Sequence, residues 1–168
     1  MLPPPSVVRA RWAENHRDLD TSPMEVIALL KRINALLAQA TEPLYEGAPL
    51  TAPEVDVLIP LRYAEPPVIA RRIAEHHGMS RAGVSKVLAK LERRGYISRA
   101  PSPTDKRAAL ITITPEGEAA IDAFFPRQLR VDAELLAGRG ADRERVVEAL
   151  SLLAGAIEEG VSARTWTD

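Results

Sequence analysis

The 168-residue sequence contains no cysteine, which excludes structural disulfides, thiol redox sensing and cysteine-based metal sites. It also lacks an apolar run of about 18 residues, so we expect no membrane partner. The first residues, MLPPPSVVRARW, have no apolar core of the kind that a secretory signal peptide needs. We therefore expect a cytoplasmic protein. A hydrophobic content of 46% is enough for one domain core, with or without dimerising extensions.

Signatures of catalysis are missing as well. The sequence has no Gly-x-Ser-x-Gly elbow, no phosphate-binding loop and no dinucleotide fingerprint. His76 and His77 are adjacent, and side chains of adjacent helical residues diverge by about 100°. A metal site built on them would need remote ligands that the sequence does not identify. We expect a protein that is not an enzyme and holds no cofactor or metal.

The net charge of −1 argues against a uniformly basic nucleic-acid binder, but the charge is unevenly distributed. Residues 71–107 contain ten lysines or arginines and three acids, a balance of +7, and the rest of the chain carries −8. Such asymmetry indicates a local face that binds a polyanion. An ordinary solvated charged surface is the alternative that charge alone leaves open.

Apolar periodicity predicts a chain that is mostly helical with one β-hairpin. Ser22 and Thr51 are expected N-caps, each followed by a proline in the first helical turn. The expected helices lie within residues 9–18, 19–40, 50–64, 66–78, 80–95, 115–136 and 141–160, and the two strands are 96–100 and 109–114. The second helix has an expected apolar stripe at Ile27, Leu30, Ile33 (or Asn34) and Leu37, and the third is expected to face inward through Val55, Leu58 and Leu61. Kinks are expected at Pro60 and Pro126.

Ala74, Gly78 and Val84 have the spacing of a helix-turn-helix. A small residue lets two helices cross closely, glycine permits the positive φ of a tight turn, and the apolar residue anchors the second helix. A purely structural helical hairpin could show the same three residues.

The second helix of this pair favours DNA recognition. Its apolar face is expected to contain Val84, Val87, Leu88 and Leu91. Small residues on the opposite face permit close approach to a major groove, where serine and lysine can bond base edges. Ser80 is the expected N-cap of this helix and can present the helix N-terminus to a phosphate. The DNA-contact candidates on this helix are Ser80, Arg81, Ala82, Ser85, Lys86, Lys90 and Arg93.

The hairpin that follows completes a winged helix. Its tip, residues 101–108, is stiffened by prolines and carries Asp105, Lys106 and Arg107. Arg107 is expected to enter an adjacent minor groove, and Lys106 to contact a phosphate. Asp105 is expected to orient Arg107 or cap the turn. An ordinary charged turn is the alternative for any one of these residues.

Residues 78–121 resemble the multiple-antibiotic-resistance regulator (MarR) family. The most specific marks are Asp105-Lys106-Arg107 in the wing and Ile113-Thr114-Pro115-Glu116-Gly117 after it. The resemblance implies a homodimer whose terminal helices pair and whose two winged lobes read a pseudo-palindrome in double-stranded DNA. It also implies a ligand-responsive regulator, most simply a repressor.

A narrower resemblance is to the urate-responsive branch of that family, through residues 19–27, an additional N-terminal helix, and Pro126. That branch uses a Trp, an Asp and two Arg to bind its ligand. Trp12, Asp56 and Arg99 match three of these positions, but the fourth falls on Val87, which cannot pair with an anion. A different small effector, aromatic and anionic, is therefore expected.

The ligand-binding candidates are Trp12, His16, Asp56 and Arg99. Simple packing is the alternative for Trp12 and His16, and a helix-surface carboxylate is the alternative for Asp56.

Together these observations predict a mostly α fold with a small β wing, in which a winged helix-turn-helix lobe joins a helical dimerisation region. A winged helix that binds proteins, without operator binding, is the alternative function. The expected organisation is a disordered tail at 1–8, N-terminal helices at 9–50 that form the dimer and ligand crevice, a DNA-binding lobe at 51–114 and C-terminal dimerisation helices at 115–168.

Overall fold

The computed structural model describes residues 2–65, 67–77, 79–102, 108–138 and 140–164. The chain divides into two compact units, Met1–Gln128 and Leu129–Asp168, which are described separately. The predictions made for Gly78, Asp105, Lys106 and Arg107 lie outside the described residues.

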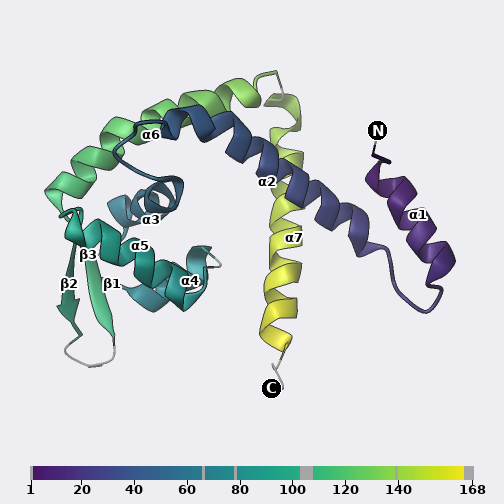
Figure 1. The fold of residues 1–168 in the computed structure, drawn as a ribbon, viewed down its shortest axis with the longest axis horizontal. Coiled ribbons are helices and arrows are strands. Elements are labelled where there is room, and N and C mark those ends of the chain that lie inside the picture. The colour runs from purple at the N-terminus through teal and green to yellow at the C-terminus, as the bar shows by residue number, and fades with distance from the viewer. Residues whose placement is uncertain (1, 66, 78, 103–107, 139, 165–168) are drawn as a thin grey trace. The chain divides into compact units, whose positions relative to one another are not determined.

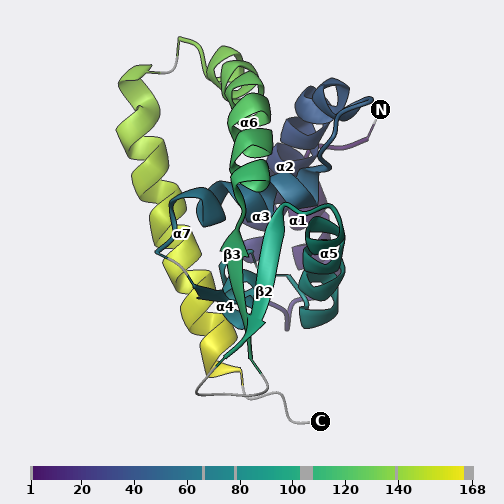
Figure 2. The ribbon, with the colours of Figure 1, turned by 90° about the vertical axis from the view of Figure 1, so that its left-hand side faces the viewer.

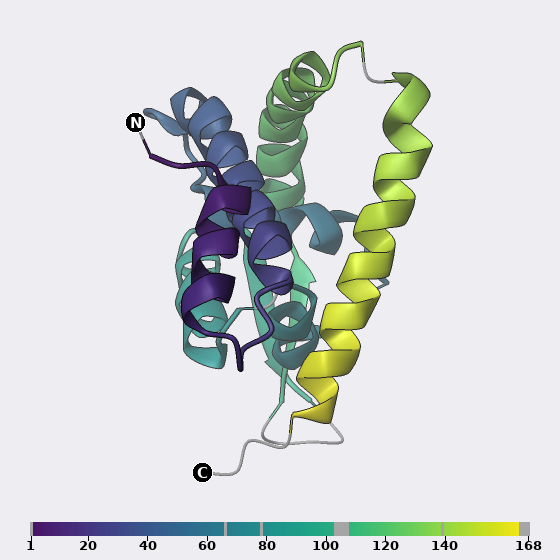
Figure 3. The ribbon, with the colours of Figure 1, turned by 90° about the vertical axis from the view of Figure 1, so that its right-hand side faces the viewer.

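The first unit begins with two helices that pack against each other, α1 (Pro5–Asn15) and α2 (Pro23–Tyr45) (Figure 3). Because proline suits the first turn of a helix, α1 already starts at Pro5, and the expected disordered tail at 1–8 is wrong for residues 5–8. Ser22 precedes α2 as expected, but its hydroxyl makes no capping bond. Its backbone N–H instead donates to Asp20 Oδ1 at 2.9 Å, which lowers the pKa of Asp20.

The remainder of this unit is a winged helix-turn-helix (Figure 1). Its fold class is the one predicted, mostly α with a small antiparallel sheet. In chain order its elements are α3 (Ala52–Tyr63), β1 (Val68–Ile69), α4 (Ala70–His77), α5 (Arg81–Arg93), β2 (Ile97–Pro101), β3 (Ala109–Ile113) and the start of α6 (Pro115–Leu135).

The sheet has the order β1-β3-β2, with both pairs antiparallel. Val68 pairs with Ile111, and Arg99 pairs with Ile111 from the other side. The prediction of helix over residues 66–78 is therefore wrong at its start. Val68 and Ile69 form β1 because two β-branched residues suit the free edge of β3, and α4 begins only at Ala70.

The core lies where α3, α5, the sheet and α6 meet. Val55, Leu58 and Leu61 are buried on α3, as predicted, and Pro60 does not interrupt that helix. The other buried apolar side chains of this core are Leu50, Val57, Ile73, Ala74, Val84, Leu88, Leu91, Ile97, Ile111, Ile121 and Phe124.

Thr114 and Gly117 join the start of α6 to the base of the wing. The Thr114 backbone N–H donates to Tyr96 O at 3.1 Å, and its hydroxyl donates to Gly95 O at 2.6 Å. The same hydroxyl oxygen accepts from the Gly117 N–H at 3.1 Å. The Thr-Pro-Glu-Gly motif therefore ties the exit of the hairpin to its entry.

The second unit contains the end of α6, a short 3₁₀ turn (Gly140–Asp142) and α7 (Arg143–Ala163). The expected kink at Pro126 does not end α6, which is continuous from Pro115 to Leu135. Across the described ranges, none of the helices combines the length and the apolar character needed to cross a bilayer.

Candidate nucleic-acid interface

Helices α4 and α5 form the predicted helix-turn-helix, seen beside the wing in Figure 2. Ala74 on α4 and Val84 on α5 are both buried. The Met79 N–H donates to Ala74 O at 3.1 Å, which closes the end of α4 before the chain turns into α5. The small and apolar positions of the motif therefore have the packing roles that their spacing predicts.

Helix α5 has one buried face and one exposed face. Val84, Leu88 and Leu91 are between 0% and 2% exposed and anchor the helix in the core. Val87, expected on the same face, is only partly buried. The exposed face carries small and cationic side chains, which can approach and bond a polyanion: Arg81, Ala82, Ser85, Lys86, Ala89 and Arg93.

Ser80 caps α5 as predicted. Its Oγ accepts a hydrogen bond from the Gly83 N–H at 3.0 Å, which satisfies one of the free donors at the helix start. Ser80 and Arg81 are exposed. The first turn of α5 is therefore accessible to a phosphate.

The wing is built by β2 and β3, whose pairing continues to its outer end, where the Ser102 N–H donates to Ala108 O at 3.0 Å. Lys106 and Arg107 lie between these two residues, outside the described part of the chain. Their roles therefore stay predictions.

Arg99 on β2 faces a cavity of about 460 Å³ between α4, α5 and the sheet. Arg71, Arg81 and Ser85 also line it, among alanine and aliphatic side chains. Arg99 Nε lies 3.0 Å from Glu92 Oε2. This cavity is therefore lined by three arginines and by side chains from both the exposed and the buried face of α5.

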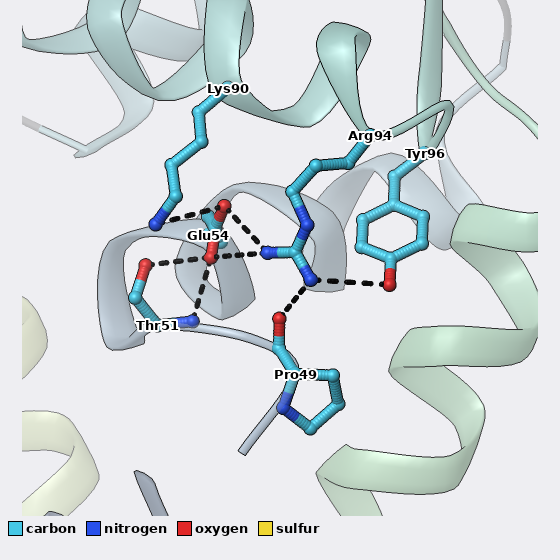
Figure 4. Close-up of polar contacts among 6 residues, drawn as sticks. All are labelled: Pro49, Thr51, Glu54, Lys90, Arg94 and Tyr96. Atoms are coloured by element: carbon cyan, nitrogen blue, oxygen red, sulfur yellow. Dashed lines mark hydrogen bonds and ion pairs between the residues drawn. The ribbon is translucent and has the colours of Figure 1, made fainter. Parts of the chain in front are cut away.

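Lys90 and Arg94, at the C-terminal end of α5, converge on one buried carboxylate (Figure 4). Glu54 of α3 is 1% exposed, and its Oε1 lies 3.1 Å from Arg94 Nη1 and 3.5 Å from Lys90 Nζ. Its Oε2 accepts from the Thr51 N–H and hydroxyl, both at 2.8 Å.

Burial alone would raise the pKa of Glu54. The hydrogen bonds from Thr51 and the charges of Arg94 and Lys90 outweigh burial, so the pKa lies below its ordinary value. Lys90, predicted to contact DNA, is therefore paired with Glu54 in the free chain.

Comparison with known proteins agrees with this geometry. Residues 48–108 match the model of the MarR family. The HTH-type transcriptional regulator PecS of Dickeya dadantii is 27% identical over 83% of this chain and 86% of its own. The winged-helix part of this chain, residues 48–108, is of the MarR family.

Two further relatives are similar to this chain over most of their length. The HTH-type transcriptional repressor YetL of Bacillus subtilis is 26% identical over 68% of this chain and 69% of its own. The PcaV transcriptional regulator of Streptomyces coelicolor, solved in complex with its natural ligand, is 28% identical, with a TM-score of 0.62 over 83% of this chain and 95% of that one. These three relatives are transcriptional regulators.

The four expected ligand residues of this chain lie in three different surroundings. Trp12 is 48% exposed and stacks on His16, with ring centroids 4.7 Å apart. Asp56 is exposed on α3. Partial desolvation raises its pKa, and the charge of His77 opposes this. Arg99 lines the cavity behind α5, whose lining includes none of the other three. The structure therefore brings together only Trp12 and His16 of this set.

Sequence reasoning missed Glu54 and Arg94. The spacing of Thr51 and Glu54 is that of a capping box, which could have marked Glu54 as a fixed carboxylate. Arg94 was missed because two of its partners, Glu54 and Pro49, lie 40 and 45 residues away in sequence.

Proposed function

We propose that the chain is a homodimeric, ligand-responsive MarR repressor that binds a pseudo-palindromic operator. The observation that carries this proposal is the two-faced α5, whose buried face fixes the helix while its exposed face presents small and cationic side chains. A helix held in this way can enter a major groove without losing its packing. YetL, which is named as a repressor, supports the sign of regulation.

The proposed contacts divide into sequence reading and positioning. Ser85 and Lys86 bond base edges in the major groove, and Arg107 enters the adjacent minor groove. Ala82 lets the helix approach closely. Backbone phosphates are contacted by Ser80, Arg81, Lys90, Arg93 and Lys106.

The proposed organisation assigns 51–114 to the DNA-binding lobe, and 9–50 and 115–168 to dimerisation. The exposed apolar side chains of α2 support this assignment. Ile27, Ile33 and Leu37 belong to its predicted apolar stripe, yet they are 41%, 48% and 43% exposed. Apolar stripes of this kind mark protein–protein contacts, and a second copy of the chain would cover them.

We further propose a small aromatic, anionic effector bound between the dimerisation helices and the DNA-binding lobe. The exposed Trp12–His16 stack offers an aromatic surface, and Arg99 offers a cation. Asp56 would bond a donor on the ligand. The ligand complex of PcaV supports a ligand-responsive MarR fold. The effector would shift the population between lobe spacings that fit the operator and spacings that do not.

The test is fluorescence anisotropy with a labelled duplex from the region upstream of this gene and a scrambled duplex, across a salt series. We expect tight binding to the first duplex only, with a log–log salt slope of several units. Equal, weak binding to both would contradict operator reading. Failure to bind either at low salt would favour a protein-interaction module.

A further inference from the structure

Lys90 differs from the other lysine of α5. Its side chain is 45% exposed, and its ammonium group lies 3.5 Å from Glu54 Oε1 (Figure 4). Lys86, one turn earlier, is exposed and makes no ion pair within the described ranges. Within the described part of the chain, one lysine charge of this helix is therefore unpaired, and the other is held by a carboxylate of α3.

Glu54 does not depend on Lys90 for its hydrogen bonds. Thr51 supplies two donors at 2.8 Å, and Arg94 Nη1 lies 3.1 and 3.2 Å from the two carboxylate oxygens. If Lys90 moved away, the buried carboxylate would keep these four hydrogen bonds and the charge of Arg94. The large cost of an unpaired buried charge would therefore not arise.

Arg94 is held much more firmly than Lys90. Besides Glu54, its guanidinium donates to Pro49 O and to Tyr96 Oη, and it lies 4.7 Å from the centre of the Tyr96 ring. Lys90 has Glu54 as its one ion-pair partner within the described ranges. A lysine is also a compact charge on a flexible four-carbon stem, so it can change partners with little movement of the backbone.

We propose that Lys90 is an exchangeable cation, which pairs with Glu54 in the DNA-free protein and moves to a backbone phosphate in the complex. Glu54 is then a positioning residue that restrains DNA affinity, and Arg94 is its permanent partner. This inference rests on the proposed DNA-binding function, because it needs a phosphate as the second partner. The exchange gives up one partly exposed ion pair, which is worth little, and gains one phosphate contact.

The first test replaces Lys90 by methionine, which keeps the aliphatic stem. We expect the magnitude of the log–log salt slope for operator binding to fall by about 0.9, the value for one phosphate contact. Lys31→Met on α2 is the matched control and should leave the slope unchanged. An unchanged slope in Lys90→Met, with wild-type protein binding normally, would overturn the exchange alone. Wild-type protein that binds no duplex would overturn the proposed function together with the exchange.

The second test is a double-mutant cycle between Glu54 and Lys90. Glu54→Gln should tighten operator binding about two- to fivefold. The substitution removes the ion pair that stabilises the DNA-free state, and a partly exposed ion pair contributes about this much free energy. The same substitution in the Lys90→Met background should change operator affinity much less, because the lysine that pairs with Glu54 is already absent. In a Lys86→Met background the full gain should persist. Equal gains in operator affinity in all three backgrounds would show that the negative charge of Glu54 acts on DNA binding as a whole and not through Lys90.

A thermal melt by circular dichroism establishes that each variant is folded at the assay temperature. If Glu54→Gln does not fold, the salt slope of Lys90→Met still decides the proposal, because Lys90 is partly exposed and its replacement leaves Glu54 bonded to Thr51 and Arg94.

Discussion

Arg107 decides whether the wing reads sequence or only supplies positive charge. We expect Arg107→Ala to weaken operator binding by about 1–3 kcal/mol and to weaken random-duplex binding much less, because a cation in a narrow minor groove senses local DNA shape. Anisotropy with both duplexes measures the two losses. Arg32→Ala, at an exposed position of α2, is the control. Equal losses on the two duplexes would leave Arg107 with a role in charge alone.

The ionised Glu54 should make part of the free energy of unfolding sensitive to acid. Its pKa is lowered in the folded chain, because the Thr51 bonds and the Arg94 and Lys90 charges outweigh the opposing effect of burial. A lowered folded pKa gives stability that is present above the unfolded value, near 4.5, and is lost as the pH falls through the folded value.

Glu54→Gln should therefore reduce the free energy of unfolding at pH 7, by roughly 1–3 kcal/mol for lost charged hydrogen bonds. It should also flatten the stability curve below about pH 5. Urea unfolding from pH 3 to pH 7 measures both effects. An acid limb as steep as that of the wild type would assign the acid sensitivity to other carboxylates.

At the scale of elements, Gly117 determines how closely α6 can approach the wing. A Cβ placed at Gly117 would lie 2.0 Å from Tyr96 O, a backbone atom that cannot move aside cheaply. We expect Gly117→Ala to destabilise the fold by about 1–3 kcal/mol, as other overpacked sites do. Urea unfolding monitored by circular dichroism measures the change.

Gly155 in α7 is the matched control, because a Cβ there meets nothing within 4 Å. Gly155→Ala should stabilise the chain by about 0.5–1 kcal/mol through helix propensity. If Gly117→Ala were equally harmless, α6 would be free to move relative to the hairpin, and the Thr114 bonds would not define its position.

The elements that the sequence predicted well are those with local causes. The Ser80 cap, the apolar face of α5 and the alternation in 109–114 each depend on residues a few positions apart. Strand β1 was missed because Val68 pairs with Ile111, and no pattern around Val68 records that partner. The helix start at Pro5 was missed because a proline-rich segment also suits extended chain.

The same distinction applies to the candidate interface. The exposed side chains of α5 were predicted from helical periodicity alone. The ion pair of Lys90 was not, because Glu54 approaches it from another helix. Three of the four ligand candidates, Trp12, Asp56 and Arg99, came from a family resemblance. Of all four, the structure brings only Trp12 and His16 into contact.

At the scale of the whole molecule, Trp12 tests whether effector binding is separate from DNA binding. Trp12 is exposed and lies on α1, remote in sequence from α5. Trp12→Ala should therefore leave operator affinity within about twofold of the wild type, because it removes no proposed DNA contact. Release of the operator by an aromatic anion should be lost in the variant.

Urate and benzoate are the probes for this experiment, added to the preformed complex in an anisotropy titration. Leu19→Ala, which removes another exposed apolar side chain near α1, is the control and should keep the response. A probe that releases the operator from the wild type and from Trp12→Ala alike would remove Trp12 from the effector site.

The exposed apolar face of α2 allows dimerisation to be tested by substitution. Ile33 and Leu37 are 48% and 43% exposed in the single chain, so a charge at either position should cost the folded monomer little. In a dimer that buries this face, the same charge would be desolvated without a partner. Ile33→Glu should therefore shift the protein from dimer to monomer in sedimentation velocity. It should also weaken operator binding, because two half-sites are no longer bound as one unit.

Gln39→Glu, at an exposed polar position of the same helix, controls for the added charge. If Ile33→Glu sediments as the wild type does, the dimer interface does not include this face of α2.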